Sequence, residues 1–376
     1  MVTAGMLLVL LLAVMPFASA CAPAPAAEEA PEEEPEAAPE AAATLPKAEY
    51  QWRLGTPWTQ DVRNQSLAMF CELIGDYSDG RIEVEFYPDG LLGSHTEIFH
   101  AVQEGTVEIG IFAPYVDIVP GGMMNWIPWT VGSFAEAAIL YTPPDGAVYK
   151  VANEAWNEVG GQLLWSSPMG LYGIGSNVRP LKTPDDLKDQ KMRVSASVAS
   201  VMAFENMGEG TGLTLHTIPW ADLYNALERG VVDMCWSLWG SLVEERHMEV
   251  LKYYTAMDWA WDCANVSMNK ELWDSLPSDL KDAIFTAGKM AEERDFEAQR
   301  RQTISHKQKV LDAGVEIYYP TTEERNLWRE KANMGQVWEE LCKPWLDEHY
   351  PGQNMTQELQ DELDRVRALA EAAGAV

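Results

Sequence analysis

Strand-like and helix-like patterns of apolar residues alternate along most of the chain. Residues 82–86 alternate between apolar side chains and glutamate, which predicts a half-buried strand. Residues 61–74 carry apolar side chains at helical spacing, and Ser94-His-Thr-Glu97 has the sequence of a capping box that opens a helix. Repeated strand–helix–strand units of this kind predict parallel sheets with helices on both faces.

The second part of the chain repeats this order. Thr183-Pro-Asp-Asp186 predicts an N-cap and a first helical turn, and Lys191-Met-Arg-Val194 predicts a strand. Val198, Val201 and Met202 predict one apolar face of the following helix. Further strands are predicted at residues 231–235, 264–268 and 315–319, and helices at 220–229, 271–310 and from 326 onward. We therefore expect two α/β lobes that the chain crosses more than once, with one long late helix.

The N-terminus predicts export. Residues 6–17 are an almost unbroken apolar run, too short for the roughly 20 residues that a membrane-spanning helix needs. The small residues Ala18, Ser19 and Ala20 follow, as in a signal-peptide cleavage site. Cys21 comes next, so the segment resembles a bacterial lipoprotein signal in which this cysteine carries lipid. An ordinary cleaved signal peptide is the alternative.

A spacer follows the cysteine. Residues 22–45 are mostly Ala, Pro and Glu, with seven glutamates and no aromatic residue. Such a segment cannot bury enough apolar surface to offset its ordering entropy, which suits a tether between a membrane and a folded body. The predicted parts are a signal peptide (1–20), a lipidated Cys with an Ala/Pro/Glu-rich linker (21–47), lobe I (48–169 plus 258–295), lobe II (170–257 plus 296–345) and a C-terminal helical tail (346–376).

The charge of the chain limits its partners. It has 58 acidic residues against 27 Lys and Arg, for a formal net charge of −31. Nucleic acid needs a basic stripe, so it is excluded as a partner. An anionic ligand would need a local positive group that acts against the global field.

The cysteines carry no metal or redox motif. Cys71, Cys235, Cys263 and Cys342 form no C-x-x-C pair, and we expect neither a metal site nor a cofactor. Cys235 and Cys263 both lie in strand-like segments, so a disulfide bond between them and buried free thiols are both open. The chain also lacks H-E-x-x-H, G-x-S-x-G, P-loop and Rossmann motifs, so we expect no enzyme.

Aromatic residues follow several of the predicted strands. Ligands of open α/β sheets bind beyond the carboxyl ends of strands, so these segments are the candidate walls of a site. They are Thr56-Pro-Trp58, Ala113-Pro-Tyr115, Gly170-Leu-Tyr172, Arg193-Val-Ser195, Trp236-Ser-Leu-Trp239 and Asp258-Trp-Ala-Trp261.

Four segments follow one another in an order and spacing that are typical of one protein family. They are Gly90-Leu-Leu-Gly93 through Glu97, Ala101–Gly110, Asn177–Leu187 with Lys191–Val194, and Tyr224–Asp233. Together they resemble the solute-binding proteins of tripartite ATP-independent periplasmic (TRAP) transporters, the DctP-like family. The resemblance implies an α/β periplasmic-binding-protein (clamshell) fold with two lobes, hinge strands and a long helix that spans both lobes. It also implies a ligand enclosed between the lobes and its delivery to a membrane permease driven by an ion gradient.

The resemblance also assigns a role to Arg193. In the family, the Arg of the strand that resembles Lys191–Val194 pairs with the ligand carboxylate. A guanidinium group suits this role because its planar fork donates two parallel hydrogen bonds to a carboxylate. A structural ion pair with one of the many acids is the alternative for Arg193.

The sequence departs from the family at two places. Gly173 stands where sialic-acid-type members carry a second Arg, and Met234-Cys-Trp-Ser237 stands where many members have Gly-Gln-Glu-Asn. Ser237 is therefore near the position of a ligand-binding Asn, and Trp236 replaces the acid used by metal-assisted binders of 2-oxo acids. We expect a box of rings, including Trp261, around a carboxylate with an apolar or aromatic body or around a zwitterion. The candidate ligand-binding residues are Arg193, Trp236, Ser237, Tyr172, Trp58, Tyr115, Ser195 and Trp259.

The predicted function is therefore that of an extracytoplasmic receptor. It would be lipid-anchored in the periplasm or on the outer face of the cell membrane, and would bind a small carboxylate-containing ligand for a TRAP permease. A receptor that feeds a sensor kinase is the alternative, because both uses share the same clamshell.

Overall fold

The computed structural model describes residues 48–59, 61–113, 127–195 and 197–374, all of which belong to one compact unit that spans residues 45–376. Two predicted functional residues, Cys21 and Tyr115, lie outside the described residues. Within the described ranges, no helix combines the length and the apolar character that crossing a bilayer requires.

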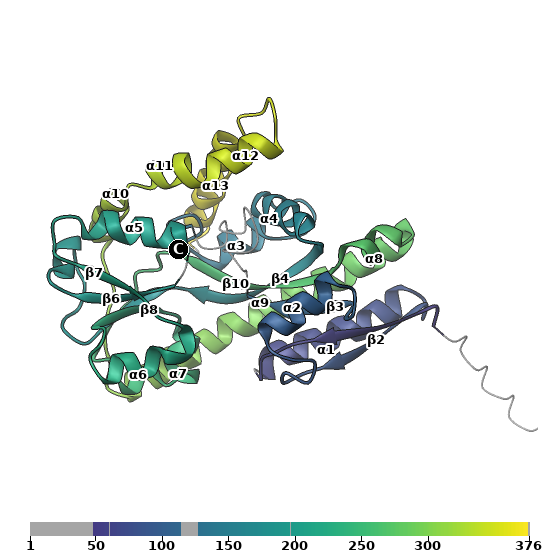
Figure 1. Cartoon of the computed structure of the whole chain (residues 1–376), viewed down its shortest axis with the longest axis horizontal. Coiled ribbons are helices and arrows are strands. Elements are labelled where there is room, and N and C mark those ends of the chain that lie inside the picture. Colours follow the sequence, from purple (N-terminus) through teal and green to yellow (C-terminus); the bar gives the residue numbers. More distant parts are fainter. Residues whose placement is uncertain (1–47, 60, 114–126, 196, 375–376) are drawn as a thin grey trace, which may run out of the picture. The chain divides into compact units, whose positions relative to one another are not determined.

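The first sheet belongs to lobe I and has five strands in the order β2-β1-β3-β10-β4 (Figure 1). The strands β2, β1 and β3 run parallel, whereas β10 is antiparallel to both β3 and β4. Their bounds are β1 Tyr50–Gly55, β2 Ile82–Tyr87, β3 Ile109–Phe112, β4 Gly161–Leu171 and β10 Trp261–Asn269.

The second sheet belongs to lobe II and has six strands in the order β11-β9-β5-β8-β6-β7. The strand β6 is parallel to β7 and β8, whereas β5 is antiparallel to β8 and β9. Their bounds are β5 Gly173–Ser176, β6 Lys191–Val194, β7 Thr214–Thr217, β8 Met234–Ser237, β9 Tyr253–Thr255 and β11 Glu316–Tyr318.

The prediction of parallel sheets was wrong for the strands that pass between the lobes. The chain leaves the first sheet in β4 and enters the second in β5 after the single residue Tyr172, and it returns through β9 and β10. Because the chain crosses back in the opposite direction, the returning strands run antiparallel to the strands of the first crossing. The result is an antiparallel pair in each sheet, formed by β10 with β4 and by β5 with β9.

Helices cover the two sheets, and one of them serves both lobes. The helix α9 packs against α1 and β4 of lobe I and against α7 of lobe II (Figure 1). Its early residues Leu280 and Ile284 belong to the core around the first sheet, and Val310 belongs to a core of the second. The bounds are α1 Asp61–Tyr77, α2 His95–Gln103, α3 Phe134–Leu140, α4 Ala147–Glu158, α5 Val198–Gly208, α6 Leu223–Glu228, α7 Trp239–Glu244, α8 Lys270–Ser275, α9 Ser278–Asp312, α10 Thr322–Ala332, α11 Met334–Val337, α12 Lys343–His349 and α13 Met355–Ala372.

The C-terminal helices contact elements of both lobes. The helices α10 and α11 pack on α5 of lobe II, whereas α13 packs on α3 and α4 of lobe I. Leu359, Leu363 and Val366 of α13 are buried in a cluster that also contains Tyr141 and Trp338. The C-terminal segment is therefore part of the folded core.

Local signals in the sequence predicted helix starts better than helix faces. The capping box of α2 is confirmed, since the Ser94 amide donates to Glu97 Oε2 (2.7 Å) and the Glu97 amide donates to Ser94 Oγ (3.4 Å). The predicted apolar face of α5 is wrong, because Val198 is 60% exposed whereas Ala203 and Phe204 are buried. The small side chain of Ala203 lets α5 pack closely, and the apolar pattern of this helix is too uniform to define its buried face.

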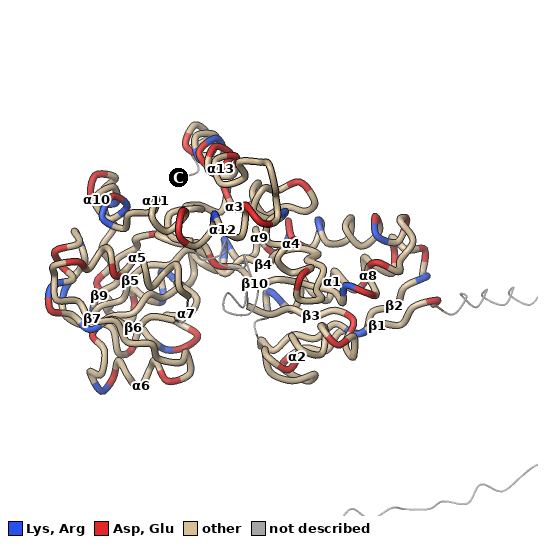
Figure 2. Tube along the Cα trace, turned by 45° about the horizontal axis from the view of Figure 1, so that its top comes forward, with Lys and Arg blue, Asp and Glu red and all other residues tan. Residues whose placement is uncertain are grey.

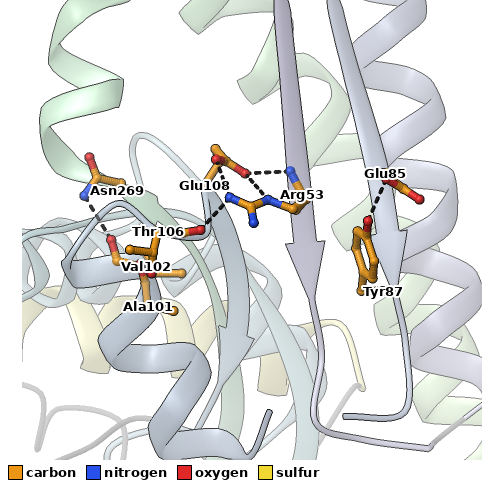
Figure 3. A network of polar contacts seen from close by, with 8 residues as sticks. All are labelled: Arg53, Glu85, Tyr87, Ala101, Val102, Thr106, Glu108 and Asn269. Atoms are coloured by element: carbon orange, nitrogen blue, oxygen red, sulfur yellow. Dashed lines mark hydrogen bonds and ion pairs between the residues drawn. The ribbon is translucent and has the colours of Figure 1, made fainter. Parts of the chain in front are cut away.

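Polar contacts tie the first sheet to the segments beside it (Figure 3). The Arg53 side chain on β1 forms an ion pair with Glu108 (2.9 Å) and donates to the Thr106 carbonyl. At the end of β10, Asn269 Nδ2 donates to the Val102 carbonyl of α2 (2.9 Å). These contacts fix β1, β10 and α2 around the segment that enters β3.

Acidic residues are spread over the elements of both lobes, as Figure 2 shows for the described residues. The described cysteines, Cys71, Cys235, Cys263 and Cys342, are all buried free thiols. Cys235 and Cys263 therefore form no disulfide bond, and the alternative of buried thiols holds.

Candidate ligand-binding site

Arg193 lies near the end of β6 and is only 4% exposed. Its Nε donates to the Ile218 carbonyl (2.9 Å), and its Cζ lies 5.4 Å from the ring centre of Trp220 and 6.0 Å from that of Trp236. Burial lowers the pKa of the guanidinium, and the groups that oppose this shift are Cys235 and Tyr172. Among the described residues, no carboxylate forms an ion pair with Arg193. The alternative of a structural ion pair therefore finds no support in the described part of the chain.

Three of the predicted rings come together beside Arg193. Trp236 stacks on Phe204 (5.4 Å between ring centres) and contacts Trp259 (5.3 Å), which in turn contacts Tyr172 (5.8 Å). All four rings are at least nine-tenths buried and belong to one apolar cluster of lobe II. Sequence reasoning missed Phe204, whose place in the cluster depends on the rotation of α5. These rings are mainly core, and they form the wall behind Arg193.

Trp261 does not join this group, so its place in the predicted box was wrong. It packs against Phe134 (4.9 Å) and stacks on Phe296 (6.0 Å), and it is 1% exposed. The reason is topological. Trp261 opens β10 in the first sheet, whereas Trp259 precedes that strand and hydrogen-bonds with Tyr172 through its backbone (3.1 Å).

The two predicted serines lie near Arg193, and each makes a local contact. Ser237 is fully buried, with its Oγ 3.3 Å from Nδ1 of His247. Ser195 is half-buried and accepts a hydrogen bond from the Ser197 amide (3.3 Å). Burial, and next the charge of Arg193, lower the pKa of His247 to about 4, so this imidazole is neutral at pH 7.

On the lobe I side, Trp58 lies with two residues that the sequence did not single out. Its ring is 4.4 Å from His95 in an edge-to-face contact, and the Arg63 Cζ lies 4.7 Å from the Trp58 ring centre. Burial, and next the charge of Arg63, lower the pKa of His95 to about 4. Trp58 follows β1 and Arg63 lies in the first turn of α1, so both lie at the carboxyl end of a parallel strand, where α/β sheets bind ligands.

Arg63 is the second buried guanidinium among the described residues. It is 1% exposed, and its Nε donates to Ser167 Oγ (2.9 Å), which donates to Asp295 Oδ2 (2.5 Å). Ser66 Oγ donates to the other Asp295 oxygen (2.9 Å). The Arg63 Nη1 atom is buried without a hydrogen-bond partner among the described residues. Its position in the first turn of the helix after β1 was the only signal in the sequence for this residue.

A cavity of about 20 Å³ lies where Arg63 meets residues of lobe II. A volume of this size holds about one water-sized group. The cavity brings together α1, the end of β4, the α7 helix that follows β8, and the part of α9 that packs on lobe II. It is lined by Arg63, Met169, Leu238, Gly240, Ser241, Glu244, Gln299, Thr303 and His306.

A hydrogen bond connects the surroundings of the two guanidinium groups. The Tyr172 hydroxyl donates to Asp262 Oδ2 (2.6 Å), and both residues are buried. Burial lowers the pKa of Arg63, and Asp262 is one of the carboxylates that oppose this shift. Burial raises the pKa of the Tyr172 hydroxyl well above its ordinary value, and Arg193 opposes this shift. The site therefore has one buried cation on each lobe, with a tyrosine and an aspartate between them.

The sequence and fold have known relatives. The C4-dicarboxylate-binding periplasmic protein DctP of Rhodobacter capsulatus is 27% identical over 276 residues, which are 71% of this chain and 79% of the relative. The 2,3-diketo-L-gulonate-binding periplasmic protein YiaO of Escherichia coli is 23% identical over 68% of this chain and 77% of its own. A TRAP periplasmic solute binding protein from Ochrobactrum anthropi, with its C-terminus bound in the ligand binding pocket, has a similar structure. The TM-score is 0.75 at 22% identity, over 87% of this chain and 98% of that chain.

The family model described as bacterial extracellular solute-binding protein, family 7, matches residues 56–343. This range contains Arg193, the rings beside it, Trp58 and Arg63, and it includes parts of both lobes. The two-lobe fold and the family match agree, and the chain belongs to the bacterial extracellular solute-binding proteins of family 7.

Proposed function

We propose that this protein is the solute receptor of a TRAP transporter and that it binds a small carboxylate between its lobes. The observation that carries the proposal is the buried guanidinium of Arg193, which has no ion-pair partner among the described carboxylates. Burying an unpaired charge is costly, so a protein that keeps one gains from a ligand of opposite charge. Both curated relatives are named for carboxylate ligands, which supports the same ligand class here.

Binding would proceed by a population shift. Arg193 on lobe II and Trp58 with Arg63 on lobe I would contact the ligand together, so the ligand would favour the state in which the lobes are closed over it. Tyr115, which lies outside the described residues, remains a predicted contact from lobe I. The closed receptor would then deliver the ligand to the membrane permease.

The protein would remain at the membrane through its N-terminus. Family membership implies a location outside the cytoplasm. The finer proposal, that lipid on Cys21 tethers the receptor, rests on the apolar run and the spacer in the sequence. Mass spectrometry of the mature N-terminal peptide tests it, and an unmodified Cys21 would rule it out. The alternative of a receptor for a sensor kinase gains no support from the relatives.

Replacement of Arg193 tests the proposed function. A thermal-shift screen with mono- and dicarboxylates, aromatic acids and zwitterions first identifies the carboxylate that binds most tightly, and calorimetry then compares the variants. Arg193→Ala should weaken binding by about 2–5 kcal/mol, because the ligand carboxylate would be buried without its partner. Arg229→Ala, an exposed position of lobe II, is the matched control. An affinity of Arg193→Ala within about threefold of wild type, less than about 1 kcal/mol, would remove Arg193 from this role.

A further inference from the structure

Two of the residues that line the cavity between the lobes each have a buried hydrogen-bond donor without a partner. These donors are Nη1 of Arg63 on α1 and Nε2 of Gln299 on α9, and neither atom has a partner among the described residues. Both side chains are more than nine-tenths buried. Buried donors are rarely left unpaired, so this cavity is suited to an oxygen acceptor of about one heavy atom.

The charges around this cavity differ from those around Arg193. Burial lowers the pKa of Arg63, and three carboxylates, Asp295, Glu244 and Asp262, oppose this shift. Arg294 is the other described cation that acts on Asp295. Burial lowers the pKa of His306, which lies beside Glu244. Its imidazole is therefore mostly neutral at pH 7. The net charge of the groups around Arg63 is therefore zero or negative, whereas no described carboxylate acts on Arg193.

The kind of oxygen that fits follows from this charge distribution. A carboxylate is an acceptor only, and beside Arg63 it would lie near the negative charges of Glu244 and Asp262. A hydroxyl accepts from Arg63 and also donates to an acidic neighbour, and a keto oxygen accepts without adding charge. Of the two guanidinium groups, Arg193 is the one on which no described carboxylate acts, so it suits the ligand carboxylate.

We propose that Arg63 is a specificity-determining residue that receives a neutral hydroxyl or keto oxygen of the ligand. The receptor then prefers monocarboxylates with such an oxygen at the far end over the corresponding dicarboxylates. This inference rests on the proposed function, because it takes the ligand carboxylate to be bound by Arg193. It replaces the expectation of an apolar or aromatic far end, since most of the rings that suggested it are buried in two apolar clusters: Tyr172, Trp236 and Trp259 in one and Trp261 in the other.

Matched pairs of probes test the preference directly. In each pair, a terminal hydroxymethyl group is replaced by a carboxylate on the same carbon chain: 3-hydroxypropionate and malonate, 4-hydroxybutyrate and succinate, 5-hydroxypentanoate and glutarate, D-gluconate and D-glucarate. Dissociation constants of the purified protein are measured for all eight probes by tryptophan fluorescence and calorimetry. At least one hydroxy acid should bind about tenfold more tightly than its dicarboxylate partner.

Two variants assign the preference to this cavity. Arg63→Met should weaken binding of the favoured hydroxy acid by about tenfold and reduce the preference, and Arg81→Met, at the edge of the first sheet, is its control. Glu244→Gln removes a negative charge without removing Arg63, so it should shift the preference toward the dicarboxylate. If Arg63→Met fails to fold because its contact with Ser167 is lost, the effect of Glu244→Gln on the preference is the test of the inference.

The outcomes separate this inference from the proposed function. The inference is wrong if no hydroxy acid is preferred over its partner, or if the preference is unchanged by Glu244→Gln. Tight dicarboxylate binding that Arg193→Ala abolishes would leave the receptor function intact while refuting the role of Arg63. If no carboxylate binds in an Arg193-dependent way, both proposals are wrong.

Discussion

The two buried arginines of the site differ in what surrounds each guanidinium. Arg63 lies near three carboxylates and is linked to Asp295 through Ser167, so the cost of burying its charge is partly offset within the protein. Arg193 has a backbone carbonyl and rings as neighbours. Taking a charge out of water without a counterion is unfavourable, and a bound carboxylate would reverse most of that cost. In the proposed function, the free energy available for ligand capture is therefore concentrated at Arg193.

The sequence predicts Trp236 as a ligand-binding residue, and its packing indicates that it also contributes to stability. It is 4% exposed and packs on Phe204, Tyr172 and Trp259. Trp236→Ala would leave a large void in this cluster, so the free energy of unfolding of the empty protein should fall by about 3–5 kcal/mol in denaturant titration.

The control for this change keeps a ring at the same position. Trp236→Phe retains part of the stacking on Phe204 and should lose less than half of that stability. If Trp236→Ala leaves the denaturation midpoint within error of wild type, the ring is not part of the lobe II core and its role lies in ligand contact alone.

Among the helices, α9 carries a buried acid that the ligand site does not use. Glu292 is 3% exposed, and its Oε1 accepts a hydrogen bond from the Ser166 amide of β4 (3.1 Å). Burial, aided by the nearby charges of Asp295 and Glu293, raises the pKa of Glu292 from 4.5 to about 8. The carboxyl group is therefore largely protonated at pH 7 in the folded protein and ionised in the unfolded chain.

This difference predicts how stability depends on pH. Because the folded-state pKa of Glu292 is raised, protonated Glu292 contributes to the free energy of unfolding. This contribution is fully present below about pH 4.5 and is lost as the pH rises to about 8. Glu292→Gln keeps an acceptor for the Ser166 amide but cannot ionise. Its free energy of unfolding relative to wild type should increase between pH 5 and pH 8, by an amount on the order of a few kcal/mol. Urea titrations at several pH values measure both free energies of unfolding. If they change with pH in parallel for the two proteins, Glu292 is ionised in the folded protein.

Sequence patterns located most elements because caps and alternation are local properties. The box at Ser94 and the strand at residues 82–86 needed no knowledge of distant neighbours. The buried face of α5, the antiparallel hinge strands and the position of Trp261 depend on how two sheets share one chain, which no short window contains. Arg63 was missed for the same reason, since its partners Ser167 and Asp295 are more than 100 residues away.

At the scale of the whole molecule, the net charge opposes the binding of the anionic ligand that we propose. The chain carries a formal charge of −31, and acidic positions occur throughout both lobes (Figure 2). An approaching anion therefore meets a repulsive field until it reaches Arg193. Salt screens such a field over a Debye length of about 30 Å at 0.01 M and about 8 Å at 0.15 M ionic strength. A contact with a buried guanidinium is screened much less.

Association and dissociation should consequently respond differently to salt. Raising the ionic strength from about 0.01 M to about 0.15 M should increase the association rate constant of a carboxylate ligand by about two- to tenfold. The dissociation rate constant should change little, because it depends on the buried contact with Arg193. Stopped-flow tryptophan fluorescence measures both constants, and an uncharged probe, the amide of the same acid, supplies the control. An association rate that falls with salt would mean that the local positive field of the cleft already outweighs the acidic surface.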